Sequence, residues 1–405
     1  MNMMKKLYWL IIVVLFTTGC ASARMRNAVP MDLLDKTEVP DFQEIRAFDG
    51  QANNFFRKDM VTIFEQDNEQ DKEGSIWAVN SNHDYAVLAI SGGAANGAYG
   101  VGLLNGWSHQ GSRPVFKVVT GVSTGAIIAP FAFIGSRYDE KLKDFYTKFS
   151  TREIMQSKGL LQVLFGDSIM SDRPLKHLIE ENIDESLLRE VAREYKKGRR
   201  LYVGTTNLDS QEFVIWDMGK IASIGNYQSL ELFRKIILAS VTIPIVFPPV
   251  YFDVEVNHQK YDEMHVDGGV SKQVFFLYNV LQGFEKAMIK NGVDMSSIKY
   301  SIYVIRNGYV DPVYKEVPDN IFAITSRTVE TLTNAQGIGD IYQLYDFTKM
   351  RNGDFNLAYI PSTYIAKTKE LFDLQEMQTL FNLGYARALR GYDWKKVPPG
   401  LNEED

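Results

Sequence analysis

A serine between two glycines is the first residue whose setting suggests chemistry. Gly121-Val122-Ser123-Thr124-Gly125 fits the pattern G-x-S-x-G, in which a serine lies on a sharp turn from a strand to a helix. Gly121 and Gly125 would let neighbouring backbone pass close to the strained serine. The helix after the turn would direct its positive end at the serine and favour the charge that develops during attack. We therefore take Ser123 as a candidate nucleophile, the alternative being an N-cap serine flanked by turn glycines.

A second signal is the small-residue loop 91–100, which contains Gly92, Gly93 and Gly97. It is not a Walker A loop, because Ala98 and Tyr99 stand where lysine and serine or threonine are required. It does not fit a dinucleotide site either, since no acidic residue occurs between residues 84 and 139. We therefore expect no bound nucleotide. A row of backbone N–H groups at the end of a strand is the composition of an oxyanion hole.

A serine nucleophile needs a base, and Asp267 is the candidate. It precedes Gly268 and Gly269, so it can occupy a turn that the backbone approaches closely; alternatively, it caps its own backbone there. No histidine follows Asp267, which excludes the order Ser, Asp, His with this acid. An earlier acid with His258 or His265 remains open. The five histidines are scattered and match no metal-binding spacing, so we expect no metal and no cofactor.

The elements that would position these residues alternate between strand and helix. Strands are predicted at 85–90, 116–120, 201–205, 212–216 and 300–305, and helices at 98–107, 126–134, 186–197, 229–240, 320–332 and 369–389. A strand, helix, strand order predicts an α/β fold with a mainly parallel sheet covered by helices.

The composition and the N-terminal sequence indicate which partners and which cellular location to expect. The chain has 405 residues, a net charge of −6 and one cysteine, Cys20, so a nucleic-acid partner and internal disulfides are not expected. Lys5 and Lys6 precede an apolar run at 7–16, which is shorter than the roughly 20 residues of a membrane-spanning helix. The small residues before Cys20 resemble the lipobox of bacterial lipoproteins. That resemblance implies an acylated Cys20, and Ser22 after it implies the outer membrane of a Gram-negative cell.

Taken together, the motifs resemble the patatin-like phospholipases over about residues 85–285. Members of this family carry a glycine-rich oxyanion loop, a G-x-S-x-G serine and a D-G-[GA] aspartate, in that order. Two further stretches, 204–209 and 239–249, are also similar to the family. The loop departs from the usual three glycines and a nearby basic residue, because Ala94 and Asn96 stand at those places.

The resemblance implies a three-layer α/β fold and a Ser123–Asp267 dyad without a histidine. It implies an oxyanion hole from the N–H groups of Gly92, Gly93 and Ala94. The supporting motif positions are Asn96, Gly97, Gly121, Gly125, Gly268 and Gly269.

Four segments are expected: a lipoprotein signal peptide at 1–19, an acidic tether with peripheral structure at 20–82, the patatin-like domain at 83–300 and a C-terminal extension packed on that domain at 301–405. The expected activity is a membrane-tethered acyl hydrolase of phospholipid or lysophospholipid. A rival is a catalytically silent envelope lipoprotein that binds lipid or a protein partner, and a third reading is a hydrolase of small esters or peptides. Residues 196–200 are read as a helix end rather than a lipid contact, and residues 275–281 as core rather than an acyl-binding wall.

Overall fold

A computed structural model describes residues 26–50, 59, 62, 83–159, 166–277, 285, 289, 298–368 and 370–402. The expected signal peptide, Cys20, most of residues 51–82 and residues 278–281 lie outside the described residues. The main strands are β1 (Arg46–Phe48), β2 (His83–Ile90), β3 (Val118–Val122), β6 (Arg200–Asn207), β7 (Glu212–Asp217), β8 (Val250–Val256), β9 (Gln259–Asp267), β10 (Ile298–Arg306) and β11 (Asp354–Tyr359). Two short strands, β4 (Gln156–Ser157) and β5 (Met170–Ser171), pair separately.

The helices follow the strands in alternation. They are α3 (Gly97–Gln110), α4 (Thr124–Ile134), α5 (Asp139–Thr147), α6 (Thr151–Ile154), α8 (Arg173–Asn182), α9 (Glu185–Lys196), α10 (Met218–Ile224), α11 (Tyr227–Val241), α13 (Ile321–Lys349) and α14 (Leu374–Leu389), with short 3₁₀ turns η1 (Met31–Lys36), η2 (Ala94–Asn96), η3 (Ser136–Tyr138) and η4 (Gly268–Val270). Polar N-caps begin several of them: the side chains of Asp184, Asn226, Asn320 and Asp373 accept hydrogen bonds from backbone N–H groups of α9, α11, α13 and α14. Within the described residues, no helix is both long and apolar enough to cross a membrane.

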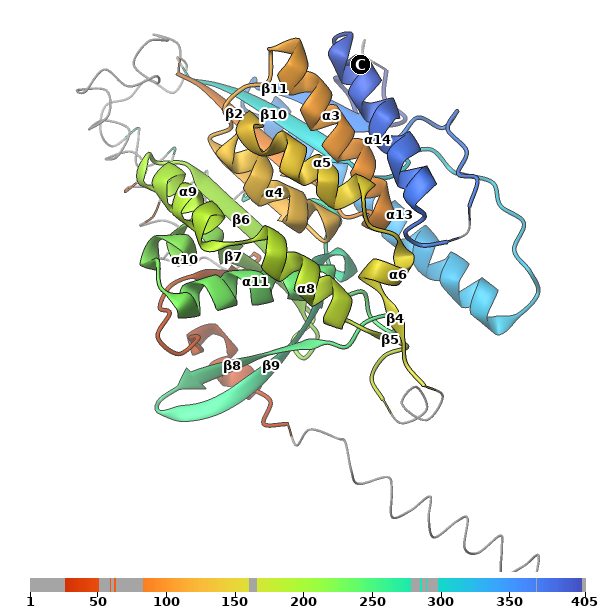
Figure 1. Cartoon of the computed structure of the whole chain (residues 1–405). Helices are drawn as coiled ribbons and strands as arrows, with labels where there is room; N and C mark the ends of the chain where they lie inside the picture. Colours follow the sequence, from red (N-terminus) through yellow and green to blue (C-terminus); the bar gives the residue numbers. More distant parts are fainter. Residues whose placement is uncertain are drawn as a thin grey trace, which may run out of the picture.

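The sheet is mainly parallel, as the sequence predicts. Strands β11, β10, β2, β3 and β6 run parallel in that spatial order, and β7 and β1 continue the sheet antiparallel. The β8–β9 hairpin joins through β9, which pairs antiparallel with β6 (Figure 1). The carboxyl ends of β2, β3 and β10 therefore meet at one edge of the sheet, where a site is expected.

The sheet lies between two hydrophobic cores, one on each face. On β2, Leu88 and Ile90 belong to the larger core, which includes side chains of α3, α4, α9, α11 and α14, whereas Val87 and Ala89 belong to the smaller one beside α13. This alternation is the pattern of a strand covered on both faces. Phe275, Phe276 and Leu277 lie in the smaller core, so these residues are structural, as the sequence analysis favoured.

Three parts of the chain differ from the expectations. The segment 26–48, expected to be part of an acidic tether with peripheral structure, packs on the domain: β1 pairs with β7, and Ile45 is fully buried. Helix α13 runs 29 residues instead of stopping near residue 332. The strands β8, β9 and β11 were not predicted; the alternating buried pattern of β8 is the signal that could have revealed it.

The basic run 196–200 ends α9. Gly198 has a φ of +77° and its N–H donates to the carbonyl of Tyr195, which is a glycine C-terminal cap. Arg199 and Arg200 are buried; Arg199 pairs with Glu194 and Arg200 pairs with Asp59. These two arginines are therefore structural and do not face a lipid surface.

Candidate active site

Ser123 lies in the sharp turn between β3 and α4. Its backbone has φ 55° and ψ −125°, a conformation that is costly for a residue with a side chain and that presents the hydroxyl outward from the strand. The serine side chain makes no capping hydrogen bond to α4, so the N-cap alternative does not describe it. A Cβ at Gly121 would collide with the carbonyl oxygen of Gly125, which explains why the turn has glycine at this position.

Ser123 donates its hydroxyl hydrogen bond to Asp267. The distance from Ser123 Oγ to Asp267 Oδ2 is 2.6 Å, and both residues are 6% exposed. The second carboxylate oxygen, Oδ1, accepts the N–H of Gly269 at 2.7 Å. The aspartate therefore caps its own turn with one oxygen and faces the serine with the other. Its carboxyl is buried rather than exposed.

The register of the sheet explains this meeting. Strand β3 pairs with β6 up to Val122 opposite Gly204, and β9 pairs with the next residue, Thr205, at Asp267. Strands β3 and β9 thus run toward each other along β6, and the residues at their carboxyl ends come together. Gly268 follows this junction, where a Cβ would lie 2.5 Å from the carbonyl oxygen of Gly204.

Burial sets the charge state of Asp267. Desolvation raises its pKa to about 6, although the hydrogen bonds from Ser123 and from the Gly269 N–H act in the opposite direction. Such a carboxylate is still ionised at pH 7 and is a stronger base than an exposed aspartate.

The glycine-rich loop follows β2 and begins beside Ser123. A Cβ at Gly92 would lie 3.2 Å from the Cβ of Ser123, so the loop passes directly over the serine. The Gly92 N–H, however, donates to the carbonyl of Gln273 at 3.0 Å. Contrary to our expectation, this N–H is not open to a substrate oxygen. No hydrogen bond in the described part of the chain engages the N–H groups of Gly93 or Ala94.

The rest of the loop is fixed by close backbone packing. A Cβ at Gly93 would collide with the carbonyl oxygen of Asn307, and one at Gly97 would collide with the side chain of Thr124. Asn96 is the last residue of η2, and its N–H donates to the carbonyl of Gly93 at 3.0 Å. Ala94 has a φ of +48°, a left-handed conformation that explains why glycine is usual at this position.

Two residues at the carboxyl end of β10, Arg306 and Asn307, lock the loop, and they were not predicted from the sequence. The N–H of Asn307 donates to Ser91 Oγ at 2.8 Å and its side-chain amide donates to the Ser91 carbonyl at 3.0 Å. Arg306 Nη1 lies 3.2 Å from Gln273 Oε1 and 3.4 Å from the Gly92 carbonyl. These two residues could have been found from their position at the carboxyl end of a predicted parallel strand, where functional residues are expected.

A narrow apolar pocket opens at Ser123. It encloses about 40 Å³ and is lined mostly by apolar side chains of α4, α5, α8, α11 and α14, among them Ile127, Phe145, Leu175, Leu178 and Met377. Ala94 lies at the same pocket. This space is smaller than an acyl chain, so the lining side chains must shift to admit one.

The histidines occupy other places. His265 Nδ1 lies 2.9 Å from Thr205 Oγ1 and its Nε2 lies 3.0 Å from Glu263, so both ring nitrogens are engaged away from Ser123. His258 lies in the turn of the β8–β9 hairpin. Across the described ranges, no three His, Cys, Asp or Glu side chains are placed to hold a metal ion.

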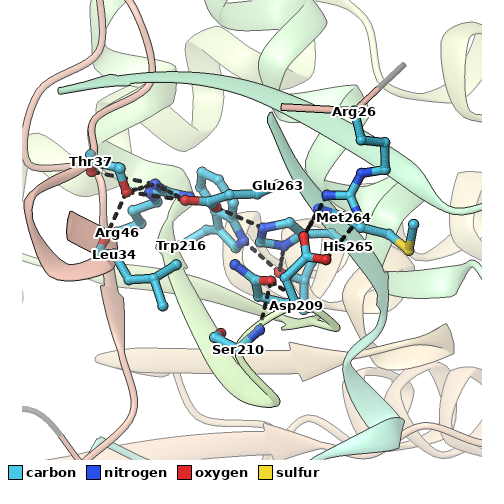
Figure 2. A network of polar contacts seen from close by, with 12 residues as sticks. Arg26, Leu34, Thr37, Arg46, Asp209, Ser210, Trp216, Glu263, Met264 and His265 are labelled. Atoms are coloured by element: carbon cyan, nitrogen blue, oxygen red, sulfur yellow. Dashed lines mark hydrogen bonds and ion pairs between the residues drawn. The ribbon is translucent and has the colours of Figure 1, made fainter. Parts of the chain in front are cut away.

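A polar network holds β9, the strand that ends in Asp267. Figure 2 shows Arg46 against Glu263, and Glu263 against His265; the Arg46 pair is buried. Arg26 pairs with Asp209 and with Asp262. Burial lowers the pKa of His265, whereas the Arg46 charge holds the pKa of Glu263 well below its usual range against the effect of burial. The N-terminal segment is thus anchored to the strand that delivers the candidate base.

Comparison with known proteins identifies the family of the central part of the chain. Residues 88–278 match the family model of the patatin-like phospholipases. These residues therefore form a patatin-like phospholipase domain, and members of this family are typically lipid acyl hydrolases. Among solved structures, the crystal structure of VipD from Legionella pneumophila is similar at 11% sequence identity with a TM-score of 0.35. That match covers 76% of this chain and 66% of VipD, just under two thirds of its length. No curated protein matches the sequence.

Proposed function

We propose that this protein is a membrane-tethered serine acyl hydrolase that cleaves carboxylic esters of phospholipids or lysophospholipids through a Ser123–Asp267 dyad. The observation that carries the proposal is the 2.6 Å hydrogen bond between the two side chains at the mouth of an apolar pocket. A strained serine, a buried carboxylate and an apolar pocket that would admit an acyl chain once its lining side chains shift have a joint use in acyl transfer.

The chemistry follows from these positions. Asp267 takes the proton of Ser123 while Oγ attacks the ester carbonyl, and the N–H groups of Gly93 and Ala94 stabilise the oxyanion. The tetrahedral intermediate collapses to an acyl-serine, and the leaving alcohol receives the proton from Asp267. Water then attacks the acyl-serine with Asp267 again as base, which releases the fatty acid and restores the serine. The raised pKa of about 6 makes Asp267 suitable for both directions of proton transfer near neutral pH.

The setting is proposed from the N-terminal sequence. Cleavage before Cys20 and acylation of its thiol would place the enzyme on a membrane of the bacterial cell envelope, with Ser22 favouring the outer membrane of a Gram-negative cell. Several acyl chains on one residue give a stable anchor, because each buried CH₂ contributes about 0.8 kcal/mol.

Labelling with a fluorophosphonate probe tests the dyad. The soluble form, residues 24–405, is compared with its Ser123→Ala and Asp267→Asn variants. We expect labelling to disappear in the serine variant and to slow strongly in the aspartate variant. If the folded wild-type protein labels no faster than Ser123→Ala, the hydrolase proposal fails and a silent lipid-binding or partner-binding protein replaces it.

The substrate is tested with esters of increasing acyl length. Hydrolysis of long-chain lysophospholipid that falls steeply as the chain shortens supports the proposal. A preference for acetyl or butyryl esters would instead indicate a hydrolase of small esters.

A further inference from the structure

Arg306 is a buried cation beside the oxyanion loop. It is the last residue of β10 and is 7% exposed. Its Nη1 lies 3.3 Å from Ser91 Oγ, 3.4 Å from the Gly92 carbonyl and 3.2 Å from Gln273 Oε1. These are neutral acceptors, and within the described ranges no carboxylate lies at ion-pair distance from the guanidinium.

Arg306 lines a pocket beside the loop. Nε and Nη2 make no hydrogen bond to any described residue, and the side chain lines a pocket of about 430 Å³. Burial lowers the pKa of Arg306 to about 10, and Asp340 acts weakly in the opposite direction. The group therefore stays charged at neutral pH. A buried charge without an ionic partner is costly, and an anion in the pocket would relieve that cost.

This polar pocket lies on the other side of the oxyanion loop from the apolar pocket. Gly93 and Asn96 line the polar pocket, whereas the next residue, Ala94, lines the apolar one together with Ser123. Gln273 connects them: its Oε1 lies 3.2 Å from Arg306 and would lie 3.5 Å from a Cβ at Gly92. An ester carbonyl held at the loop could thus extend its acyl chain to one side and its alcohol half to the other.

Among the described residues that line this pocket, Arg306 is the cation without an ion-pair partner, and Asp311 adds one negative charge to the same lining. Arg327 and Glu330 of α13 both line the pocket, and they pair with each other at 3.0 Å. Their charges balance, so Glu330 does not cancel the field of Arg306. Asp311 also lines the pocket, and Arg327 further donates to the carbonyl of Val313.

We propose that Arg306 binds the phosphate of the phospholipid headgroup during ester cleavage at Ser123. The inference rests on the proposed function and specifies its substrate class. Arg306 would supply, from the end of β10, the positive charge that Asn96 does not provide in the loop. A guanidinium suits this role because its planar N–H groups bind a phosphate in a two-point arrangement.

A pair of lipids that differ in the phosphate tests the proposal kinetically. Wild type, Arg306→Gln and Arg306→Lys are compared on lysophosphatidylcholine and on a monoacylglycerol with the same acyl chain. We expect Arg306→Gln to lower kcat/KM for the lysophospholipid at least tenfold, mainly through KM, and to change monoacylglycerol hydrolysis less than threefold. Arg306→Lys should restore part of the lost activity. Arg193→Gln, an exposed arginine on α9, is the control for the change in net charge.

Two kinetic outcomes would overturn the proposal. An equal loss on both lipids, with slower fluorophosphonate labelling, would mean that Arg306 only supports the loop and would overturn the proposal. Unchanged kinetics on both lipids would overturn it as well.

A binding measurement separates this proposal from the proposed catalysis. Calorimetry with the Ser123→Ala protein should detect sn-glycerol 3-phosphate, not glycerol, and Arg306→Gln in that background should weaken binding at least tenfold. Binding of this kind would stand even if the wild type hydrolysed no ester. If inorganic phosphate binds as tightly and Arg306→Gln leaves lysophospholipid kinetics unchanged, the pocket takes free phosphate and the headgroup assignment is wrong.

Discussion

The hydroxyl of Ser240 accepts a hydrogen bond from the backbone N–H of Ser123 at 3.0 Å. The same hydroxyl donates to the carbonyl of Gly204 at 2.7 Å. Ser240 lies near the end of α11 and Gly204 lies in β6, so one buried side chain ties the nucleophile turn to both elements. This contact accounts for two stretches, 204–209 and 239–249, that resemble the family without carrying the chemistry themselves.

Replacement of Ser240 by alanine should impair the nucleophile without removing it. The Ser123 N–H would lose its buried acceptor, a loss that costs about 1–3 kcal/mol. We expect a lower melting temperature and a decrease in kcat of about tenfold, which corresponds to roughly 1.4 kcal/mol in the barrier. Ser223→Ala on α10, whose hydroxyl also donates to a backbone carbonyl, is the matched control. Equal kcat values for the two variants would contradict a positioning role for Ser240.

Activity should follow the ionisation of Asp267. Because burial raises the pKa to about 6, the base is protonated below that value and ionised above it. We expect kcat/KM for a neutral ester to rise through pH 6, to reach a plateau above pH 7 and to fall about tenfold per unit at lower pH. The rate is measured at constant ionic strength with a check that the protein stays folded. A profile that stays flat down to pH 4.5 would show that Asp267 is not the base.

Replacement of Ala94 by glycine should stabilise the protein and preserve its activity. Ala94 has a φ of +48°, and glycine adopts this conformation without the steric cost, so the free energy of unfolding should increase by about 0.5–1 kcal/mol. The backbone N–H is kept, so kcat should change less than threefold. Chemical denaturation measures the stability, with Ala95→Gly in the same 3₁₀ turn as the control. If Ala94→Gly destabilises the protein as much as Ala95→Gly does, no strain is stored at residue 94.

Filling the apolar pocket should shorten the preferred acyl chain. Leu178 is buried and lines the pocket beside Ser123. We expect Leu178→Trp to lower kcat/KM for a palmitoyl ester at least tenfold and to leave an acetyl ester within threefold, because only the long chain needs the filled space. Leu389→Trp, at an exposed position on α14, is the control. A parallel loss for both esters would place the acyl chain elsewhere or indicate general damage to the fold.

The sequence predicted the parallel strands β2, β3, β6 and β10, but not β11, and it predicted the motifs that follow β2 and β3, because apolar runs and glycine motifs are local signals. It could not predict that β3 and β9 meet end to end along β6, since that junction depends on the pairing of a hairpin that was not predicted. The hydrogen bond that engages the Gly92 N–H and the position of Arg306 beside the loop could not be predicted for the same reason. Both depend on residues 273 and 306, which are far from the loop in sequence and come beside it only through the sheet.

The residue at which the tether ends and packed structure begins could not be predicted from the sequence. Residues 26–48 are polar enough in sequence to suggest a linker, but Arg26 forms ion pairs with Asp209 and Asp262, and β1 extends the sheet. Ion pairs between distant segments and a three-residue edge strand leave little periodic signal.

The anchoring of Arg26 has a consequence for reach. Cys20 and Arg26 are six positions apart in the sequence, and a fully extended chain of that length spans at most about 22 Å. If Cys20 is acylated as proposed, this short connection keeps the domain close to the bilayer that holds the acyl chains. Lipids of that bilayer would then be its substrates, and a membrane across an aqueous compartment would lie beyond its range.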